Sequence, residues 1–562
     1  MNANFNAKNI FSTVKKYAAK DFKHDLIAGI VVGLIALPLA IAFAVASGAR
    51  PEQGIYTSII AGLVIGTLSG SRFQIAGPTG AFIVILLGVV NKFGMDGLMV
   101  AGCMAGIILL LMGLFRLGSV IKFIPYPVTI GFTSGIGVII FSGQIKDFLG
   151  LKFDHRPSDF IETVELIVRE ASHGVNMSSV IIGLITLIIF LLWKKYGTSF
   201  PPAPIALAGG IVTSVVITYV FKNTLPAPIL VGEIPSGLPQ FHMLSASFAD
   251  IKLLIPSAFT IAMLGAIESL LSAVVADGMT GTKHNSNKEL VAQGVGNIIL
   301  PFFGGIPATG AIARTAANIR NGARTRMSSI IHAITLLLIL LVAAPYAKFI
   351  PVAALATILI MVAYNMAEIP HFVRLLKAPR QDAFVLVATF LLTVFLDLTV
   401  AVGGGIVLAA ILFIQRVSNL NVTKITEDPD GVGSEGSARM HASLEDYPQI
   451  HLYELAGPLF FGVAAELENT IEHRSGELLI LRMKHVNHID ASAINTLELI
   501  IDKVKKAKGH VFISTLSDTI RKKFEKLGLI DKLGGEYYTP ESTTVAIERA
   551  KEMIEKRKTA KK

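Results

Sequence analysis

Long apolar stretches recur along the first three quarters of the chain and are separated by short polar connections. A transmembrane helix needs about 20 predominantly apolar residues. Twelve stretches approach that length, at roughly 25–46, 53–69, 97–115, 124–143, 177–193, 202–221, 255–276, 288–303, 327–345, 349–367, 383–397 and 398–415. Two further segments, 76–90 and 307–320, are short and are interrupted by glycine and proline. The pattern therefore predicts a polytopic α-helical membrane protein with fourteen transmembrane segments.

The pattern changes near residue 443, where short apolar runs alternate with amphipathic ones. "IHLYEL", "ELLILRM" and "HVFIST" are typical of strands, and we expect helices near 463–473, 491–507 and 517–527. Strands that alternate with helices predict a small α/β domain. The predicted organisation is a cytoplasmic N-terminal segment (1–24), a transmembrane domain (25–418), a linker (419–442) and a soluble domain (443–562).

Composition supports this division. Only 16% of the 562 residues are charged, whereas soluble domains carry about 25%. From residue 441 onward, however, 37 of 122 residues are Asp, Glu, Lys or Arg. Cys103 is the only cysteine, which excludes a disulfide within the chain. No GxxxxGK[ST] motif is present, so nothing indicates ATP hydrolysis. We expect no cofactor, no metal and no enzymatic activity.

The net charge of +10 is better explained by membrane topology than by nucleic-acid binding. With the N-terminus inside, basic residues fall in the inner loops, as the positive-inside rule requires. These residues are Arg72, Arg116, Lys122, Lys194, Lys195, Lys283, Lys288, Arg320, Arg324, Arg326, Arg374, Lys377 and Arg380. An even number of spans returns the soluble domain to the cytoplasm, and we expect the inner (plasma) membrane as the location.

An internal repeat relates the two halves of the transmembrane domain. Thr79-Gly80-Ala81 and Thr309-Gly310-Ala311 are the same tripeptide at an offset of 230 residues, and Gly66 and Gly296 match at the same offset. Each half then holds seven spans, an odd number, so the halves insert with opposite orientations. Inverted repeats with an interrupted element at the same place in each half are typical of secondary transporters.

The two interrupted segments predict an anion-binding site. In each, an extended approach (72–77 and 304–306) gives way to a half-helix, with a proline near its first turn. Opposed half-helix N-termini offer unpaired N–H groups and positive dipole ends. The alternative is that glycine and proline only kink helices that face lipid. The predicted substrate-binding residues are Gly77, Pro78, Thr79, Gly80, Ala81, Thr309, Gly310 and Ala311.

Two charged residues are predicted at membrane depth. Glu268 is flanked by apolar turns, and an ionisable group there costs about 2.5–3.5 kcal/mol on insertion scales. Ser272 follows at i+4 on the same helix face. Arg314 lies about one turn into the second half-helix and is the natural partner of Glu268 or of the anion. We expect Glu268 and Ser272 to couple proton movement to anion movement; the alternative is a permanent structural ion pair.

Three segments carry a specific resemblance: "GPTGAF", "LGAIESLLSAVVADGMTGTKHNSNKELVAQGVGN" and "FFGGIPATGAIARTAANIRNGA". They resemble the sulfate permease (SulP) family of anion transporters over essentially the whole chain. The resemblance implies a 7+7 inverted-repeat fold with core and gate domains, an elevator-like mechanism and a homodimer. Within the family, the chain is most similar to bacterial C4-dicarboxylate permeases, which implies proton-coupled uptake of fumarate or succinate.

The resemblance also adds site residues. In animal members, the residues that match Leu39, Phe43, Thr79, Ala313 and Arg314 surround the anion. Leu39 stands where those members have a polar residue. Sodium-dependent bicarbonate transporters of the family are similar too, but they lack an arginine that matches Arg314. A cation would compete with that guanidinium, so we expect a coupling proton in preference to sodium.

The soluble domain resembles the STAS domain that usually closes these permeases, through "GPLFFG" and "HIDASAINTLELI". In free-standing STAS regulators the serine that matches Ser492 is phosphorylated. The alternative is that Asp490 or Ser492 caps the helix that follows. A cytoplasmic partner of this domain is a further expectation.

Other functions stay open at this point. A sodium-dependent bicarbonate or sulfate symporter would fit the same fold. A passive anion channel, or a sensor that signals through its STAS domain, belongs to another class. Glu268 favours coupled transport, because a channel has little need of a buried titratable group.

Overall fold

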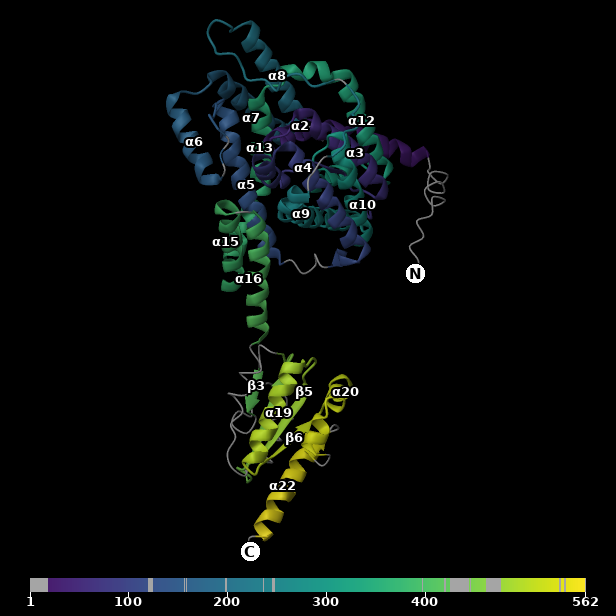
Figure 1. Cartoon of the computed structure of the whole chain (residues 1–562), viewed down its shortest axis with the longest axis vertical. Coiled ribbons are helices and arrows are strands. Elements are labelled where there is room, and N and C mark those ends of the chain that lie inside the picture. The colour runs from purple at the N-terminus through teal and green to yellow at the C-terminus, as the bar shows by residue number, and fades with distance from the viewer. Residues whose placement is uncertain are drawn as a thin grey trace. The chain divides into compact units, whose positions relative to one another are not determined.

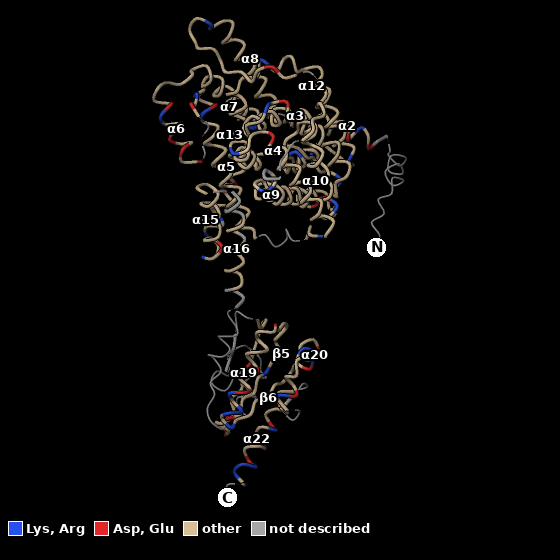
Figure 2. The backbone as a smooth tube through the Cα atoms, in the orientation of Figure 1, with Lys and Arg blue, Asp and Glu red and all other residues tan. Residues whose placement is uncertain are grey.

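The fold is described from a computed structural model, which covers residues 19–560 except 120–124, 156, 158, 198–199, 236, 245–247, 397, 419–420, 425–443, 445, 461–476, 535–536 and 540–541. The chain divides into two compact units, Met1–Ala409 and Ala410–Lys562. In Figure 2 the first unit is almost entirely tan, whereas blue and red segments are frequent in the second. The boundary between the units lies about 30 residues before the rise in charge near residue 441, within the expected transmembrane domain 25–418.

Seven helices of the first unit pack together into what we call the core bundle (Figure 1). Its helices are α2 (Ala19–Ala46), α3 (Pro51–Leu68), α4 (Phe82–Leu114), α9 (Phe248–Thr280), α10 (Ser286–Ile299), α11 (Ile312–Arg320) and α12 (Met327–Ala343). Small residues allow close contacts: a Cβ added to Gly106 of α4 would lie 2.6 Å from the Ile298 nitrogen of α10. Such glycine contacts are a common way to pack helices in lipid.

The other helices of this unit form the gate bundle, in which α5 packs against α6, α13 and α15, and α7 packs against α8 and α13. They are α5 (Tyr126–Leu149), α6 (Phe160–His173), α7 (Met177–Tyr196), α8 (Pro202–Tyr219), α13 (Val352–Met366), α14 (Ile369–Leu376) and α15 (Arg380–Phe395). The helix α16 (Leu398–Ser418) begins in this unit and ends in the second. Two short 3-10 helices, η2 (Leu300–Phe303) and η3 (Ala344–Phe349), follow α10 and α12. The two bundles touch where α2 meets α8 and α13.

Local sequence explains several helix ends. Proline opens α3 and α8 at the first position, where its missing N–H costs nothing. Asn176 and Asn285 cap α7 and α10 by accepting the N–H of Ser179 (3.1 Å) and Lys288 (3.0 Å). Gly94 has φ 71° inside α4, a value that glycine adopts readily. The half-helix and the span after it, expected as separate elements, are therefore joined as one kinked helix.

A helix occurs at the position of each predicted span, with boundary shifts of several residues. Within the described residues, eight helices are long and apolar enough to cross a membrane. Two helices occur where loops were expected. α6 is amphipathic, and its N-cap Asp159 accepts the Glu162 N–H (2.8 Å). α14 is eight residues long and has no buried side chain. Neither has the length or the apolar run that identifies a span.

The second unit is an α/β domain with a five-stranded sheet in the order β3-β4-β5-β6-β7. β3 pairs antiparallel with β4, and the remaining pairs are parallel. Its elements are β3 (Asn421–Lys424), β4 (Ile450–Ala456), β5 (Leu478–His485), β6 (His510–Ser514), β7 (Tyr538–Thr539), α19 (Ala491–Lys506), α20 (Asp518–Lys526), α21 (Leu529–Leu533) and α22 (Thr543–Ala560). α19, α20 and α21 share one apolar cluster with the sheet and α22 shares another.

The three expected strands and two of the three expected helices of this domain are thus present, whereas the helix near 463–473 lies outside the described residues. One strand falls outside the expected domain limits. β3 comes from the segment 419–442, which was expected to be a linker, and it extends the sheet by pairing with β4. Its four residues are too few and too polar to identify a strand from the sequence.

Candidate functional site

The two repeats meet in a two-stranded antiparallel ribbon inside the core bundle. β1 (Ala76–Gly77) pairs with β2 (Thr309–Gly310), with Ala76 opposite Gly310 and Gly77 opposite Thr309. The Ala311 N–H extends the ladder by donating to the Ile75 carbonyl (2.8 Å). The identical tripeptides therefore lie side by side, as an inverted repeat requires. The second strand begins at Thr309, later than the expected 304–306 approach.

Each strand leads into a half-helix. α4 begins at Phe82 and α11 begins at Ile312. At the start of α4, the N–H groups of Phe82 and Ile83 already donate to the carbonyls of Thr79 (3.3 Å) and Gly80 (3.1 Å). The first N–H groups of α11 have no partner within their helix, so this start presents donors and a positive dipole end to the ribbon. Pro78 and Pro307 do not occupy first turns, contrary to the expectation, because each stands four or five residues before its helix. They lie in the extended backbone, whose φ suits proline.

Arg314 is the buried cation of this site. It is 2% exposed, and its Nη2 donates to the Pro78 carbonyl (3.0 Å), which links the second half-helix to the first. Its Nη1 is buried without a hydrogen-bond partner. The guanidinium lies 5.9 Å from the centroid of the Phe43 ring. Gly77 is needed beside it, because a Cβ there would collide with Nη1.

Glu268 of α9 is not paired with Arg314, so the structure does not show the permanent ion pair that was the alternative to a coupling role. Its Oε2 instead accepts the hydroxyl of Thr79 (2.7 Å), which stands at the start of the first half-helix. Arg314 likewise has no carboxylate partner among the described side chains. Both charged residues thus bond to the segment between β1 and α4: Glu268 to the side chain of Thr79, and Arg314 to the carbonyl of Pro78.

Thr309, the repeat partner of Thr79, has a different environment. It is fully buried, its hydroxyl donates to the Gly265 carbonyl (3.0 Å), and it contacts the Ser269 hydroxyl (2.7 Å). Ser269 also accepts the N–H of Gly310 (3.0 Å). The Thr309 hydroxyl is therefore fully used in joining β2 to α9.

Ser272 also lies in a structural network. Its hydroxyl donates to Oγ1 of Thr315 (3.1 Å), which in turn accepts the Ile75 N–H (3.0 Å). Ser272 is buried one turn beyond Glu268 on α9. Through Thr315 it connects α9 to α11 and to Ile75, the residue directly before β1. Its contacts are those of a positioning residue for the ribbon.

Several residues that hold the ribbon were not singled out from the sequence. The Asn297 side chain donates to the Ala308 carbonyl (2.8 Å) and accepts the Ala308 N–H (2.8 Å), as a neighbouring strand would. Thr57 accepts the Ile306 N–H (2.8 Å). Gln74 donates to the Ser269 carbonyl (3.1 Å). Isolated polar residues in or next to apolar segments, as in "GVGN" for Asn297, were the signal that could have identified them.

The remaining candidates surround the start of the half-helices. Phe43 of α2 is 5% exposed and lies between Arg314 and Gly80. Leu39 is half-buried one turn earlier and packs against the apolar cluster around Ile75. Ala313 is exposed at the start of α11 and Ala311 is buried as its N-cap. On the gate side, a Cβ on Gly80 would lie 2.8 Å from the Met366 sulfur of α13, so the site borders both bundles.

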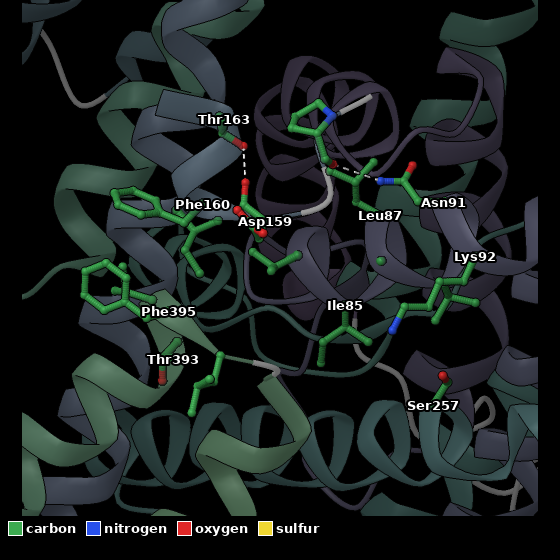
Figure 3. A pocket seen from close by; sticks show the side chains of 17 residues that line it. Ile85, Leu87, Asn91, Lys92, Asp159, Phe160, Thr163, Ser257, Thr393 and Phe395 are labelled. Atoms are coloured by element: carbon green, nitrogen blue, oxygen red, sulfur yellow. Dashed lines mark hydrogen bonds between the residues drawn. The ribbon is translucent and has the colours of Figure 1, made fainter. Parts of the chain in front are cut away.

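A cavity of about 230 Å³ lies between the two bundles, farther along α4 (Figure 3). Its core side is formed by α4 from Val84 to Lys92 and by Ser257 of α9, and its gate side by α6 and the end of α15. Among the described residues that line it, Lys92 is the only cation. The cavity thus runs along α4 beyond its start, and Thr79, Gly80 and Arg314 are not among the residues that line it.

Ser492 lies in the other unit, exposed in the first turn of α19. The helix is capped by Asp490, which accepts the Ala493 N–H (2.8 Å), so Ser492 is not the cap. Phosphorylation of Ser492 stays a prediction.

Comparison with known proteins agrees with this architecture. Residues 22–389 match the sulfate permease family and residues 441–544 match the STAS domain. The chain is 42% identical to the candidate sulfate transporter YvdB of Bacillus subtilis (strain 168), over 93% of this chain and 97% of that protein. It is 32% identical to the bicarbonate transporter BicA of Picosynechococcus sp. (strain ATCC 27264 / PCC 7002 / PR-6), over 92% of each chain.

The fold of a solved structure supports the same assignment. The murine Solute Carrier 26 family member A9 anion transporter in the inward-facing state superimposes with a TM-score of 0.84 at 19% identity. The match covers 98% of this chain and 96% of that one. These relatives are transporters and not enzymes. The chain belongs to the sulfate permease family of anion transporters, and its C-terminal unit is the STAS domain of that family.

Proposed function

We propose that this protein is a secondary active transporter that carries a small anion together with a proton. The observation that supports this best is the state of Arg314: a buried guanidinium with no carboxylate partner and one orphaned nitrogen. An unpaired buried charge is costly, and the cost falls when a counter-charge binds beside it. The start of α11 adds backbone N–H donors to the same place.

The anion would sit between the two half-helix starts. Thr79 and Gly80 border it from the first half, and Ala311 and Arg314 border it from the second. Phe43 closes the site from α2, at the distance given above. A charge-assisted hydrogen bond to Nη1 would hold one oxygen of the anion, because that nitrogen has no other acceptor.

Proton coupling follows from the hydrogen bond between Thr79 and Glu268. When Glu268 is ionised, it can only accept, so it holds the Thr79 hydroxyl proton. When Glu268 is protonated, it can donate to Thr79 Oγ1, and the Thr79 O–H is then free to turn toward the anion. Protonation would thus release one more donor for the substrate. The anion and the proton would bind together, and low pH would tighten anion binding by linkage.

The substrate class is a small anion, and we favour a C4-dicarboxylate such as fumarate or succinate. The combination of Glu268 with Arg314 supports this choice, since a carboxylate of the substrate matches the guanidinium. Bicarbonate or sulfate is the second candidate, because the relatives at 32% and 42% identity are named for these anions. A sodium ion would face repulsion from Arg314, so a proton is the favoured coupling ion.

Movement of the core bundle against the gate bundle would give alternating access. The site lies within the core bundle except for its border at Met366, and the cavity beside it lies between the bundles. We propose the inner (plasma) membrane as the location, with the N-terminus and STAS domain cytoplasmic, as the loop charges indicate. The homodimer implied by the family resemblance can be measured by light scattering of the purified protein.

Uptake into proteoliposomes tests this function. Labelled fumarate, succinate, sulfate and bicarbonate are offered with no gradient, with an inward proton gradient or with an inward sodium gradient. Accumulation above the external concentration, driven by protons alone, is the expected result. Uptake that only equilibrates under every gradient would instead identify a passive channel, and sodium-driven accumulation would identify a sodium symporter.

A sensor role is tested by removing residues 443–562. A transporter should still bind and move its anion without the STAS domain, because every residue assigned to the site lies in the first unit. Loss of anion binding by a folded truncated protein would favour the sensor.

A further inference from the structure

A second cavity, of about 640 Å³, opens at the end of the core bundle that the loop charges place in the cytoplasm. Three connections meet there: the segment after α3, the loop between α9 and α10, and the start of α12. Four basic residues line it, namely Arg72, Lys283, Lys288 and Arg326. The start of α10 lies beside them and adds a positive dipole end.

The acids near this cavity are already occupied. Asp277 accepts from His284 through Nδ1 (2.7 Å) and through its backbone N–H (2.9 Å). Glu289 is fully buried and accepts from the Gly70 N–H (2.9 Å), from Gln293 Nε2 (3.0 Å) and from the Ser69 hydroxyl. Within the described part of the chain, no ion pair joins any of the four basic residues to a carboxylate.

Arg326 shows the resulting excess of positive charge. Its Nη2 donates to the Ser69 carbonyl (2.9 Å), and its Nε is buried without a partner. Burial lowers the pKa of Arg326; Glu289 acts in the opposite direction and the charge of Arg72 lowers it further. An orphaned donor and clustered like charges around a cavity are features that an anion would relieve.

We propose that this cavity is a binding site for a phosphate group, separate from the transport site. Four cations and a helix start favour a multiply charged oxyanion, which phosphate supplies through several acceptor oxygens. The volume exceeds what one phosphate fills, so the group would belong to a larger molecule or bind with water. An anionic phospholipid headgroup and a phosphate-bearing solute share this chemistry, and the experiment separates them.

Binding here would act on the transport site through the chain itself. Arg72 lies four residues before β1, and the segment between them includes Gln74, whose side chain holds α9. Glu289 binds the other end of this segment through Gly70. A phosphate bridging Arg72 to Arg326 and Lys288 would therefore restrict the approach to β1. All three connections belong to the core bundle, so the ligand would move with it.

The test compares the full-length wild type with Arg72→Gln/Lys288→Gln and with the control Arg374→Gln/Lys377→Gln. The control removes two exposed basic residues from another inner connection. Thermal unfolding is measured in detergent with increasing inorganic phosphate, and in nanodiscs of phosphatidylcholine with or without phosphatidylglycerol. Monodisperse elution and an unchanged midpoint without ligand show that the variants are folded.

We expect stabilisation of wild type and control by at least one of the two sources. The cavity variant should need about tenfold more ligand, or more, for the same shift, since tenfold corresponds to about 1.4 kcal/mol. A response to phosphatidylglycerol alone identifies a lipid headgroup, and a response to inorganic phosphate in detergent identifies a solute. The Arg314→Gln variant should respond as wild type does. No response of wild type to either source, equal responses of the two double variants, or loss of the response in Arg314→Gln would each overturn the proposal.

Discussion

The two half-sites of the proposed anion site share the tripeptide Thr-Gly-Ala but differ in their hydrogen-bond partners. In the first, Thr79 points its hydroxyl at the carboxylate of Glu268. In the second, the Thr309 hydroxyl donates to the Gly265 carbonyl and contacts the Ser269 hydroxyl, both in the same helix, α9. The first half-helix therefore carries an adjustable polar contact, and the second carries a fixed one beside the charge of Arg314. The two repeats supply the two strands of the ribbon. Both threonines bond to the same helix, α9, but to different residues of it, so their hydrogen bonds differ.

The largest expected effect is the loss of anion affinity when Arg314 is replaced. Arg314→Gln should weaken anion binding by about 100-fold, because it removes a charge-assisted hydrogen bond worth about 1.5–3 kcal/mol. Isothermal titration of the purified protein with its transported anion measures this. Without anion, the thermal midpoint should stay the same or rise, because an unpaired buried charge has been removed.

Arg320→Gln is the matched control for this change. Arg320 is exposed at the end of the same helix, α11, and its loss should leave anion affinity near the wild-type value. Equal losses in the two variants would mean that Arg314 acts only as a surface charge does.

The next effect concerns coupling and tests the adjustable side. Glu268→Gln places an amide donor beside Thr79, as a protonated acid would. The variant should bind anion at least as tightly as wild type at neutral pH, and its affinity should no longer increase as the pH falls. Proton-driven accumulation in proteoliposomes should be lost. If the variant still accumulates anion with protons alone, Glu268 is not the coupling group.

Matching substitutions of Thr79 and Thr309 test directly whether the two threonines have different roles. Thr79→Val should reduce anion affinity by about five- to tenfold, the value of one hydrogen bond, with a normal thermal midpoint. Thr309→Val should lower stability by about 1–2 kcal/mol, because the buried Ser269 hydroxyl loses its acceptor and the Gly265 carbonyl loses its donor. Affinity in the folded fraction of that variant should change little. The reverse pattern would show that the adjustable side is β2–α11.

The smallest expected effect is at the far end of the first half-helix. Lys92→Gln should raise the apparent KM for the anion about two- to threefold at low salt, and the difference should fade at high salt as screening shortens its reach. Lys152→Gln is the control, because Lys152 is exposed in the same predicted outer region but does not line the cavity in Figure 3. An equal effect of both would assign the change to general surface charge.

Much of this site could be predicted from the sequence because it depends on local rules. The paired tripeptides, the glycine and proline interruptions and the apolar flanks of Glu268 all follow from backbone propensity and the cost of charge in lipid. The partners of polar groups could not be predicted in this way. An acid and a base at similar depth suggest an ion pair. In the structure, however, Glu268 bonds to the Thr79 hydroxyl and Arg314 bonds to the Pro78 carbonyl.

The starts of the half-helices α4 and α11 differ from the predicted ones for a related reason. The half-helix starts lie about a turn later than their prolines. In the second half, β2 occupies part of the segment between Pro307 and α11, and in the first half β1 ends at Gly77, just before Pro78. Such pairing joins segments that are distant in sequence, and no local propensity reports it. Asn297 and Thr57 hold the ribbon from other helices and show the same limitation.

The pairing of β1 with β2 also has a consequence for how the protein is made. β1 emerges from the ribosome more than 200 residues before its partner strand, a delay of some tens of seconds at roughly 5–20 residues per second. During that interval its backbone N–H and C=O groups lack their final partners, at a cost that lipid does not relieve. The first repeat should therefore stay with the insertion machinery or a chaperone until the second arrives, and nascent chains stalled before β2 should be the most sensitive to proteolysis.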